Sequence, residues 1–580
     1  MHVVLSRDPD GTVRVHDGAP RAVPAAGLAS LVAASEGGAR DERPLPRWTW
    51  DDTNRWYLGL LRAGVRVERS HDLRLVHRIL RSSVPAAGSA LATAPPGPWD
   101  AMAPTPAGAV PATGARRAPQ DDSLFDLAAP AAPEPAPAAG TDPRAELRRQ
   151  EDAVAGSSAP GRLRLLAAGE SAGALVAAEM HHAGLPWRSD VHDAILTEAL
   201  GPRPPEGHRP ARLEELARQI RAALDAPPSL NPDSHPDLLK AMQYAGVGAR
   251  SLRKWELEKL EHPVVAPLLE YKNLYRLLTA NGWHWLDEWV ADGRFRTEYV
   301  VGGVVTGRWS STGGGALQLP KGVRRAVVAD PGWCLVVADV AQLEPRVLAA
   351  MAGDEAMAGA GREGDLYAGI VASGVVPTRE LAKVGMLGAM YGGTTGASAQ
   401  VLPRLGREYP RAIALVEDAA RTGERGGVVT TWLGRSSPGP GSAWDEAQAG
   451  AFADDAGADA AARARSVTRS WGRFTRNFVV QGTAAEWALC WLASIRRRLW
   501  ALGAAPGARP GLAPAPFADR PHLAFFLHDE VVVHAPLELA DAVAAEVRAA
   551  AEEAGRLLFG DFPVDFPLTV ATVDSYADAK

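Results

Sequence analysis

Two apolar runs, far apart in the chain, each meet carboxylate side chains and constrain the fold most strongly. Residues 334–338 form an uninterrupted apolar run that ends at Asp339. Residues 523–534 form a second run, interrupted only by His528, Asp529 and Glu530. Such runs are typical of buried strands. The interruption predicts a hairpin whose turn projects these three polar residues from the surface of a sheet.

Two aspartates at the ends of adjacent strands would repel each other without a cation. A buried carboxylate without a partner costs several kcal/mol, so such groups pair or bind metal. Two Mg²⁺ ions about 3.5–4 Å apart would hold Asp339 and Asp529 and clamp phosphate oxygens. The alternative interpretation is structural: Asp339 caps the helix expected at 342–350, and Asp529 is an ordinary turn residue.

A third segment, residues 378–393, places two cations and an aromatic side chain at helical spacing. Arg379, Lys383 and Tyr391 stand at positions i, i+4 and i+12 and are expected on one helix face. The two cations of such a face would bind a triphosphate, and the aromatic ring would stack on a base or sugar. The sequence lacks GxxxxGK[ST], so a P-loop does not hold the phosphates. An ordinary amphipathic helix is the alternative, although three glycines between 385 and 392 are poor helix formers.

Basic residues gather in two places that suit phosphate oxygens. Residues 294–325 carry six basic residues against one acid. A predicted helix presents Arg465, Arg469 and Arg473 every four residues, with Arg476 beside them, and residues 460–485 contain no acid. Both patterns are typical of contacts to a nucleic-acid backbone.

The composition of the chain excludes several classes of protein. Apolar residues make up 46% and charged residues 22%, as in globular proteins. Two cysteines exclude a disulfide scaffold and a CxxC metal site. No uninterrupted stretch of 18 apolar residues occurs, so no membrane span is expected. The amino terminus turns polar after five residues, unlike a secretory signal.

Residues 81–140 differ from the rest because 36 of these 60 positions are Ala, Pro or Gly. Such a segment buries too little surface to order itself, which predicts a disordered linker, bounded at 83–158. Within it the sequence QDDSLFDL, Gln120 to Leu127, carries the large apolar pair Leu124 and Phe125. This pair is either a docking peptide or a chance occurrence.

Five motifs in one order resemble those of the family A, polymerase I type, DNA polymerases. They are residues 306–311 (TGRWSS) with Leu317-Gln318, residues 339–346 (DVAQLEPR), Arg379 to Gly392, Arg473 to Ala485, and His528-Asp529-Glu530. The resemblance covers roughly residues 165–580. It implies an α+β right-hand polymerase, with an antiparallel palm sheet and helical fingers and thumb. An RNase H-like α/β domain of the exonuclease type would precede it.

The resemblance divides the chain into six parts. These are a degenerate exonuclease-like domain (1–82), the linker (83–158), a helical region and thumb (159–290), the first part of the palm (291–350), the fingers (351–470) and the second part of the palm (471–580).

The resemblance also implies a role for each matching residue. Asp339 and Asp529 would hold two Mg²⁺ ions, for which Mn²⁺ can substitute, with the carbonyl of Val340. Lys383 would be the acid for pyrophosphate, and Glu344 would reject a ribose 2′-OH. The dNTP site would comprise Arg379, Lys383, Tyr391, Glu344, Gln342 and Leu387. Contacts to DNA would come from Arg308, Gln318, Arg473, Asn477, Gln481 and His528, and Glu530 would be auxiliary.

Some positions depart from the family pattern. Leu387 stands where the family has Phe, and Tyr367, after Asp365, stands where the family has His. Val340-Ala341 replaces Tyr-Ser. The ligands, the lysine and Tyr391 are present, so chemistry is expected to persist, while nucleotide and sugar discrimination at Leu387 is open.

Fewer residues carry the resemblance of the amino-terminal part to an exonuclease domain. Residues 58–80 resemble the second conserved segment of the family's 3′–5′ exonuclease, with Asp72 at the carboxylate position. The opening strand lacks the family's DxE pair. Two-metal exonuclease chemistry needs about four carboxylates, so we expect an inactive domain. We also expect no 5′ nuclease domain.

The sequence thus predicts a template-directed DNA polymerase that adds dNTPs to a primer 3′-OH, in replication or repair gap filling. Expected partners are primer–template DNA, dNTPs and a sliding clamp bound through 120–127, with no membrane. We expect a cytoplasmic, nucleoid-associated monomer. The alternatives are a catalytically idle DNA-binding repair scaffold, an active bifunctional 3′–5′ exonuclease/DNA polymerase, and a polymerase for RNA or a reverse transcriptase; Glu344 argues against RNA synthesis.

Overall fold

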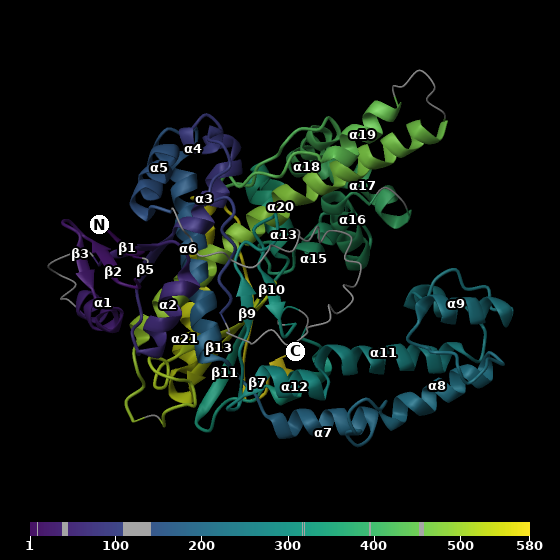
Figure 1. Cartoon of the computed structure of the whole chain (residues 1–580). Helices are drawn as coiled ribbons and strands as arrows, with labels where there is room; N and C mark the ends of the chain where they lie inside the picture. The colour runs from purple at the N-terminus through teal and green to yellow at the C-terminus, as the bar shows by residue number, and fades with distance from the viewer. Residues whose placement is uncertain are drawn as a thin grey trace.

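The structure is a computed structural model. It describes residues 1–8, 10–37, 45–107, 141–315, 317, 319–393, 396–451, 458–507 and 509–579. Figure 1 shows a central body, a block of helices beside it that includes α13–α20, and a long helical arm formed by α7–α12. This is the α+β right-hand arrangement, with the amino-terminal unit on the side of the body away from the arm.

The palm is a four-stranded antiparallel sheet in the order β12-β13-β11-β14. Its strands are β12 (His522–Leu527), β13 (Glu530–Pro536), β11 (Trp333–Val340) and β14 (Leu568–Val573). Every residue of β12 and β13 is buried, which explains their mostly apolar sequence. The two apolar runs therefore form adjacent strands, as predicted. Helix α21 (Ala540–Phe559) packs against this sheet and against α20.

Helix α20 (Ala458–Leu502) is continuous across the predicted boundary between fingers and palm at 470/471. By length and composition, an 18-residue window of this helix could cross a membrane, but 89% of that window is buried inside the protein. Its apolar character is therefore that of a core helix.

The fingers have a hydrophobic core of their own. Two of the glycines in α16 serve this packing, because a Cβ at Gly385 would lie 2.6 Å from Val401 and one at Gly388 would lie 2.5 Å from Ser398. These two glycines therefore let α17 pack closely against α16. The helices are α13 (Leu343–Ala352), α14 (Glu355–Ala360), α15 (Leu366–Ala372), α16 (Arg379–Tyr391), α17 (Gly396–Glu408), α18 (Pro410–Glu424) and α19 (Ser442–Ala451).

The predicted helical region 159–290 divides in two. Helix α6 (Pro160–Ala183) lies in the body against α2, α20 and β12. The later helices form the arm, with a separate core. They are α7 (Ser189–Leu200), α8 (Ala211–Ala223), α9 (His235–Tyr244), α10 (Lys254–Leu257), α11 (Val265–Asn281) and α12 (Trp283–Trp289). Short strands follow or flank them: β6 (Leu185–Pro186), β7 (Val290–Ala291), β8 (Arg294–Phe295), β9 (Glu298–Val300) and β10 (Ser310–Gly313).

The amino-terminal unit has the predicted RNase H-like sheet. Its order is β3-β2-β1-β4-β5, with β1, β4 and β5 parallel and β2 and β3 antiparallel. The elements are β1 (His2–Arg7), β2 (Val13–His16), β3 (Arg21–Val23), α1 (Leu28–Glu36), β4 (Arg47–Trp50), α2 (Thr53–Arg62), β5 (Arg69–Asp72) and α3 (Leu73–Ser82).

The prediction of a disordered linker over the whole of 83–158 is wrong at both ends. Helix α4 (Ala90–Thr93) follows α3, and α5 (Pro143–Ala155) packs against α3. Leu91, Trp99 and Leu147 are buried. A few large apolar side chains anchor these ends despite the Ala- and Pro-rich composition. The clamp-motif residues Gln120, Leu124 and Phe125 lie outside the described residues.

A buried polar joint ties the amino-terminal unit to the palm. Arg496 of α20 donates from Nε and Nη2 to Glu179 of α6 at 3.0 and 2.6 Å. The hydroxyl of Tyr57 on α2 donates to the same carboxylate at 2.5 Å. All three side chains are buried, and a buried carboxylate tolerates this position only while it is paired.

Loss of the cation should therefore destabilise the fold. We expect Arg496→Met to lower the free energy of unfolding by about 3–5 kcal/mol, because it leaves Glu179 buried without its principal partner. The neighbouring Arg497, half-exposed and paired with Glu553, is the control. Arg497→Met should cost less than about 1 kcal/mol. Denaturant unfolding measures both, and equal losses would contradict the role of the joint.

Candidate active site

The strand register brings the two predicted aspartates together. On β11 and β13, Asp339 stands opposite Glu530, and the Val340 amide donates to the carbonyl of Asp529 at 3.1 Å. Opposed Cα atoms in such pairs are about 5 Å apart, and consecutive ones about 3.8 Å. The Cα atoms of Asp339 and Asp529 are therefore at most about 9 Å apart. Both side chains are partly exposed.

Unusual backbone conformations flank both aspartates. Leu527 pairs with Glu530 across a two-residue turn made of His528 and Asp529. His528 has a φ of 59°, and Gln342, three residues after Asp339, has a φ of 48°. Only four described residues other than glycine have a positive φ. Strained residues of this kind cluster at functional sites.

Glu530 differs from the two aspartates because it is buried and engaged. It accepts a hydrogen bond from the hydroxyl of Tyr576 and lies 3.4 Å from Arg324. Asp339 does not cap the following helix, whose N-cap is Gln342. Two part-exposed carboxylates fit Mg²⁺, which binds one or two carboxylates together with substrate phosphates. Among the described residues, no cluster of three or more His, Cys, Asp or Glu side chains could form a metal cage.

Helix α16 presents the predicted face. Arg379, Lys383 and Leu387 are exposed and Tyr391 is partly exposed. Residues 382, 385, 386 and 389, on the other side of the helix, are buried. The spacing in the sequence thus predicts this face correctly.

The Tyr391 end of α16 contacts the segment that follows Asp339 directly, and the Arg379 end is joined to it through Asp365. At one end, Arg379 Nε donates to Asp365 Oδ2 at 2.6 Å, and Gln342 Nε2 donates to Asp365 Oδ1 at 3.4 Å. At the other end, the Tyr391 hydroxyl donates to Glu344 Oε2 at 2.7 Å. The cationic face is therefore held beside the strand that carries Asp339.

Glu344 is held from two sides. Arg308 donates from Nη2 to its Oε1 at 2.5 Å, opposite the bond from Tyr391. Burial and then the Glu344 charge raise the pKa of Tyr391, so its hydroxyl stays protonated and can donate. Partial desolvation and then the nearby Arg308 charge lower the pKa of His528, although its side chain is exposed.

The DNA-contact candidates differ in their surroundings. Asn477 is buried and interacts with the Tyr391 hydroxyl, and the stem of Arg473 lies against Gly392. Gln481 is partly exposed on the same helix. Arg476, the expected neighbour of the arginine stripe, is buried instead and donates to Ala389 and Glu417. Gln318 lies outside the described residues.

Comparison with known proteins decides the family. The profile of "DNA polymerase family A" matches residues 212–577, more than half of the chain. The chain belongs to the family A DNA polymerases.

Individual relatives agree with this assignment. "DNA polymerase I, thermostable" of Thermus filiformis is 29% identical over 56% of this chain and 37% of its own length. "DNA polymerase I" of Chloroflexus aurantiacus is 28% identical over 50% of this chain and 30% of its own. The matches thus span about a third of these curated relatives.

A solved structure shares the fold. The chain resembles the POL domain of Pol1 from M. smegmatis, solved in complex with a DNA primer-template and dNTP. The TM-score is 0.65 at 17% identity, over 98% of this chain and 92% of that one. The similarity therefore includes the amino-terminal unit of this family A polymerase.

Asp72, which stands at the position of an exonuclease carboxylate by resemblance, is engaged in the fold of the amino-terminal unit. It is fully buried and caps α3, accepting from the Leu75 amide at 3.0 Å. Its other oxygen accepts from the amide and hydroxyl of Thr53 at 2.8 and 2.7 Å. Burial raises its pKa to about 6. Both oxygens accept hydrogen bonds from Thr53 and from the start of α3, so this carboxylate has a structural role in the fold.

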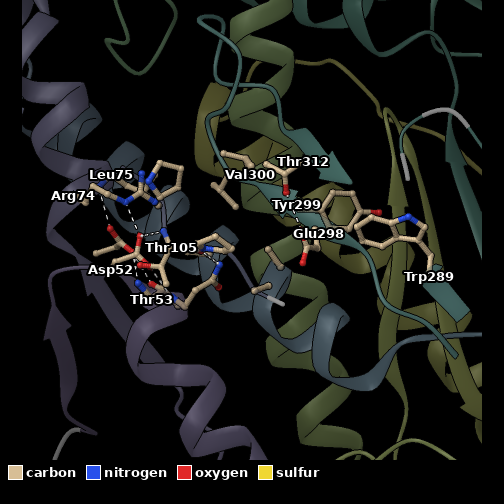
Figure 2. Close-up of a pocket in the computed structure, with 18 of the residues that line it drawn as sticks. Asp52, Thr53, Arg74, Leu75, Thr105, Trp289, Glu298, Tyr299, Val300 and Thr312 are labelled. Carbon is tan, nitrogen blue, oxygen red and sulfur yellow. Dashed lines mark hydrogen bonds and ion pairs between the residues drawn. The ribbon is translucent and has the colours of Figure 1, made fainter. Parts of the chain in front are cut away.

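A cavity of about 390 Å³ lies between the amino-terminal unit and the palm. Figure 2 shows Asp52, Arg74 and Thr105 on one side and Glu298 and Trp289 on the other. None of the predicted polymerase residues lines it. The cavity is therefore separate from the site around Asp339 and Asp529.

Sequence reasoning missed Asp365 as part of the site. The sequence places it beside Tyr367, ahead of the fingers helix, but an acidic residue before an apolar stretch indicates only a helix cap. Its contacts to Arg379 and Gln342 join segments distant in sequence, and no local pattern reports them.

The end of α16 offers a test of how tightly the site is packed. Gly392 has a φ of 76°, and a Cβ there would lie 2.6 Å from Arg473 Cγ. Gly396 has a φ of 64°, with nothing within 4 Å of a Cβ. Alanine at either position should cost about 1 kcal/mol for the left-handed backbone. Gly392→Ala must also displace Arg473, so thermal unfolding should show a larger loss than for Gly396→Ala. Equal losses would contradict the close contact.

Proposed function

We propose that the chain catalyses template-directed DNA synthesis, adding dNTPs to a primer 3′-OH. The register of β11 with the β12–β13 hairpin carries this proposal, because it brings Asp339 beside Asp529. Carboxylates so placed suit nucleotidyl transfer, in which phosphate charge must be neutralised at a fixed point.

The residues around this pair fit two divalent cations. Asp339 and Asp529 would hold two Mg²⁺ ions, with Mn²⁺ as a substitute, and the Val340 carbonyl would complete the ligand set. When bound, the ions would activate the primer hydroxyl and stabilise charge on the triphosphate.

The exposed face of α16 would receive the triphosphate. Lys383 offers a point charge and a proton for the leaving pyrophosphate, and Arg379 offers a planar fork for phosphate oxygens. Tyr391 would lie beside the nascent base pair and Leu387 would replace an aromatic contact. Glu344, held by Arg308 and Tyr391, would exclude a ribose 2′-OH.

Primer–template DNA is the proposed partner. Arg473, Asn477 and Gln481 follow one another along α20 at intervals of four residues, and Asn477 interacts with Tyr391. They would contact the duplex together with Arg308, Gln318 and His528. Gap filling in repair or replication, a monomeric state, nucleoid association in the cytoplasm and clamp binding through 120–127 remain proposals.

Removal of one carboxylate tests the function. Asp529→Asn should lower primer extension by several orders of magnitude, because one metal ligand loses its charge, while duplex binding stays intact. Asp519→Asn, which alters an exposed ion pair with Arg520, is the control and should extend normally. Gel extension with Mg²⁺ and dNTPs, beside a duplex-binding titration, measures both. Substantial extension by the Asp529 variant would overturn the assignment, and an inert wild type would favour the idle scaffold.

We also propose that the amino-terminal unit has no 3′–5′ exonuclease activity. The engagement of Asp72 in capping α3 supports this, since two-metal hydrolysis needs free carboxylate oxygens. A primer with a mismatched 3′ end, incubated with the enzyme and Mg²⁺ but no dNTPs, should remain full length. Excision of the mismatched nucleotide would instead establish the bifunctional alternative.

A further inference from the structure

The guanidinium of Arg379 is anchored at one edge only. Arg379 is the first residue of α16, and its Nε donates to Asp365 Oδ2 at 2.6 Å. Among the hydrogen bonds of the described residues, neither of its Nη atoms has a partner. Its side chain is 53% exposed. The Nη edge, which can bind phosphate through two parallel hydrogen bonds, is therefore available.

The Asp365 carboxylate is itself fixed by the backbone. It is the N-cap of α15, and its Oδ1 accepts from the amides of Tyr367 at 3.0 Å and Ala368 at 3.2 Å. Gln342 Nε2 approaches the same oxygen at 3.4 Å. Because these bonds hold Oδ1, the position of Oδ2 is also fixed. Arg379 therefore donates to a rigid acceptor.

An aromatic ring supports the same guanidinium. Arg379 Cζ lies 5.6 Å from the centroid of the Tyr367 ring, within cation–π range. Tyr367 is buried except for 7% of its surface, so the ring does not move freely. Asp365 and Tyr367 thus restrain the guanidinium by two contacts of different kinds.

The anchor is connected to the strand that carries Asp339. Gln342 follows Asp339 by three residues, and its Oε1 accepts from the Leu366 amide at 3.2 Å and from Arg346 Nη2 at 3.3 Å. Its amide therefore joins the end of β11 to the start of α15. These bonds connect the Arg379 anchor to the segment that follows Asp339.

We propose that Asp365 is a positioning residue for the incoming nucleotide, which holds Arg379 with its Nη edge ready for the triphosphate. The inference rests on the proposed function. Arginine has large rotamer freedom, and binding is tighter when that freedom is restricted beforehand. Asp365 uses Nε and leaves both Nη groups, so it orients the guanidinium without occupying its phosphate-binding edge.

Asparagine isolates the charge of Asp365 from its capping role. Asn is as good an N-cap as Asp, so Asp365→Asn keeps α15 capped while it removes the ion pair. The control is Asp418→Asn on α18, which removes an exposed Asp–Arg pair with Arg421 elsewhere in the fingers. Thermal unfolding should show both variants folded like the wild type.

Single-nucleotide incorporation then separates positioning from structure. We expect Asp365→Asn to raise KM for the dNTP about five- to tenfold with kcat within about twofold, because ground-state capture of the phosphates weakens. Arg379→Gln should raise KM at least as much. The double variant should match Arg379→Gln, since Asp365 acts only through Arg379. Asp418→Asn should leave both constants unchanged.

Several outcomes would overturn the inference. An unchanged KM for Asp365→Asn would show a capping role alone, and a lowered KM would show that Asp365 competes with the nucleotide for Arg379. Additive effects in the double variant would show that Asp365 acts independently of Arg379. If the wild type extends no primer, the proposed function fails separately. Calorimetric titration of dATP into each variant bound to a dideoxy-terminated primer–template then decides the positioning role by the same comparisons.

Discussion

The antiparallel pairing of β11 with β13 is the interaction on which the rest of the site depends. Side chains alternate between the two faces of a strand, so a slip of one residue would turn Asp339 to the opposite face. Buried contacts hold the register: the Trp333 ring stacks on His534 with centroids 4.5 Å apart, and β14 pairs with the other edge of β11. The buried apolar residues of these strands therefore fix the positions of Asp339 and Asp529 at the strand ends.

The fingers depend on the same strand through two polar contacts. Gln342 and Glu344, just after β11, reach the two ends of α16 by way of Asp365 and Tyr391. A hydrophobic core alone would hold α16 beside α17 but would not fix its exposed face relative to Asp339. These directional bonds fix the exposed face of α16 relative to the end of β11.

Much of this arrangement follows from local pattern. The apolar runs predict β11 and the hairpin, and the spacing of Arg379, Lys383 and Tyr391 predicts one helix face, because burial and helical period determine both. The pattern could not show that Trp99 and Leu91 would order part of an Ala- and Pro-rich segment, since that depends on partners distant in sequence. It also could not show that Asp72 caps α3, because a capping carboxylate and a metal-binding one look alike until their hydrogen bonds are known.

The amino-terminal unit is built into the palm rather than attached beside it. Helix α6 lies between them, and its Glu179 binds Arg496 of the palm and Tyr57 of the amino-terminal unit. Nearer the start of the same helix, Glu170 pairs with Arg435, which follows α18 in the chain. Isolated charges are costly in such surroundings, so each pair holds only while both sides stay docked. The amino-terminal unit therefore completes the buried surroundings of α6. In this way it also supports α20, the helix that carries Arg473 and Asn477.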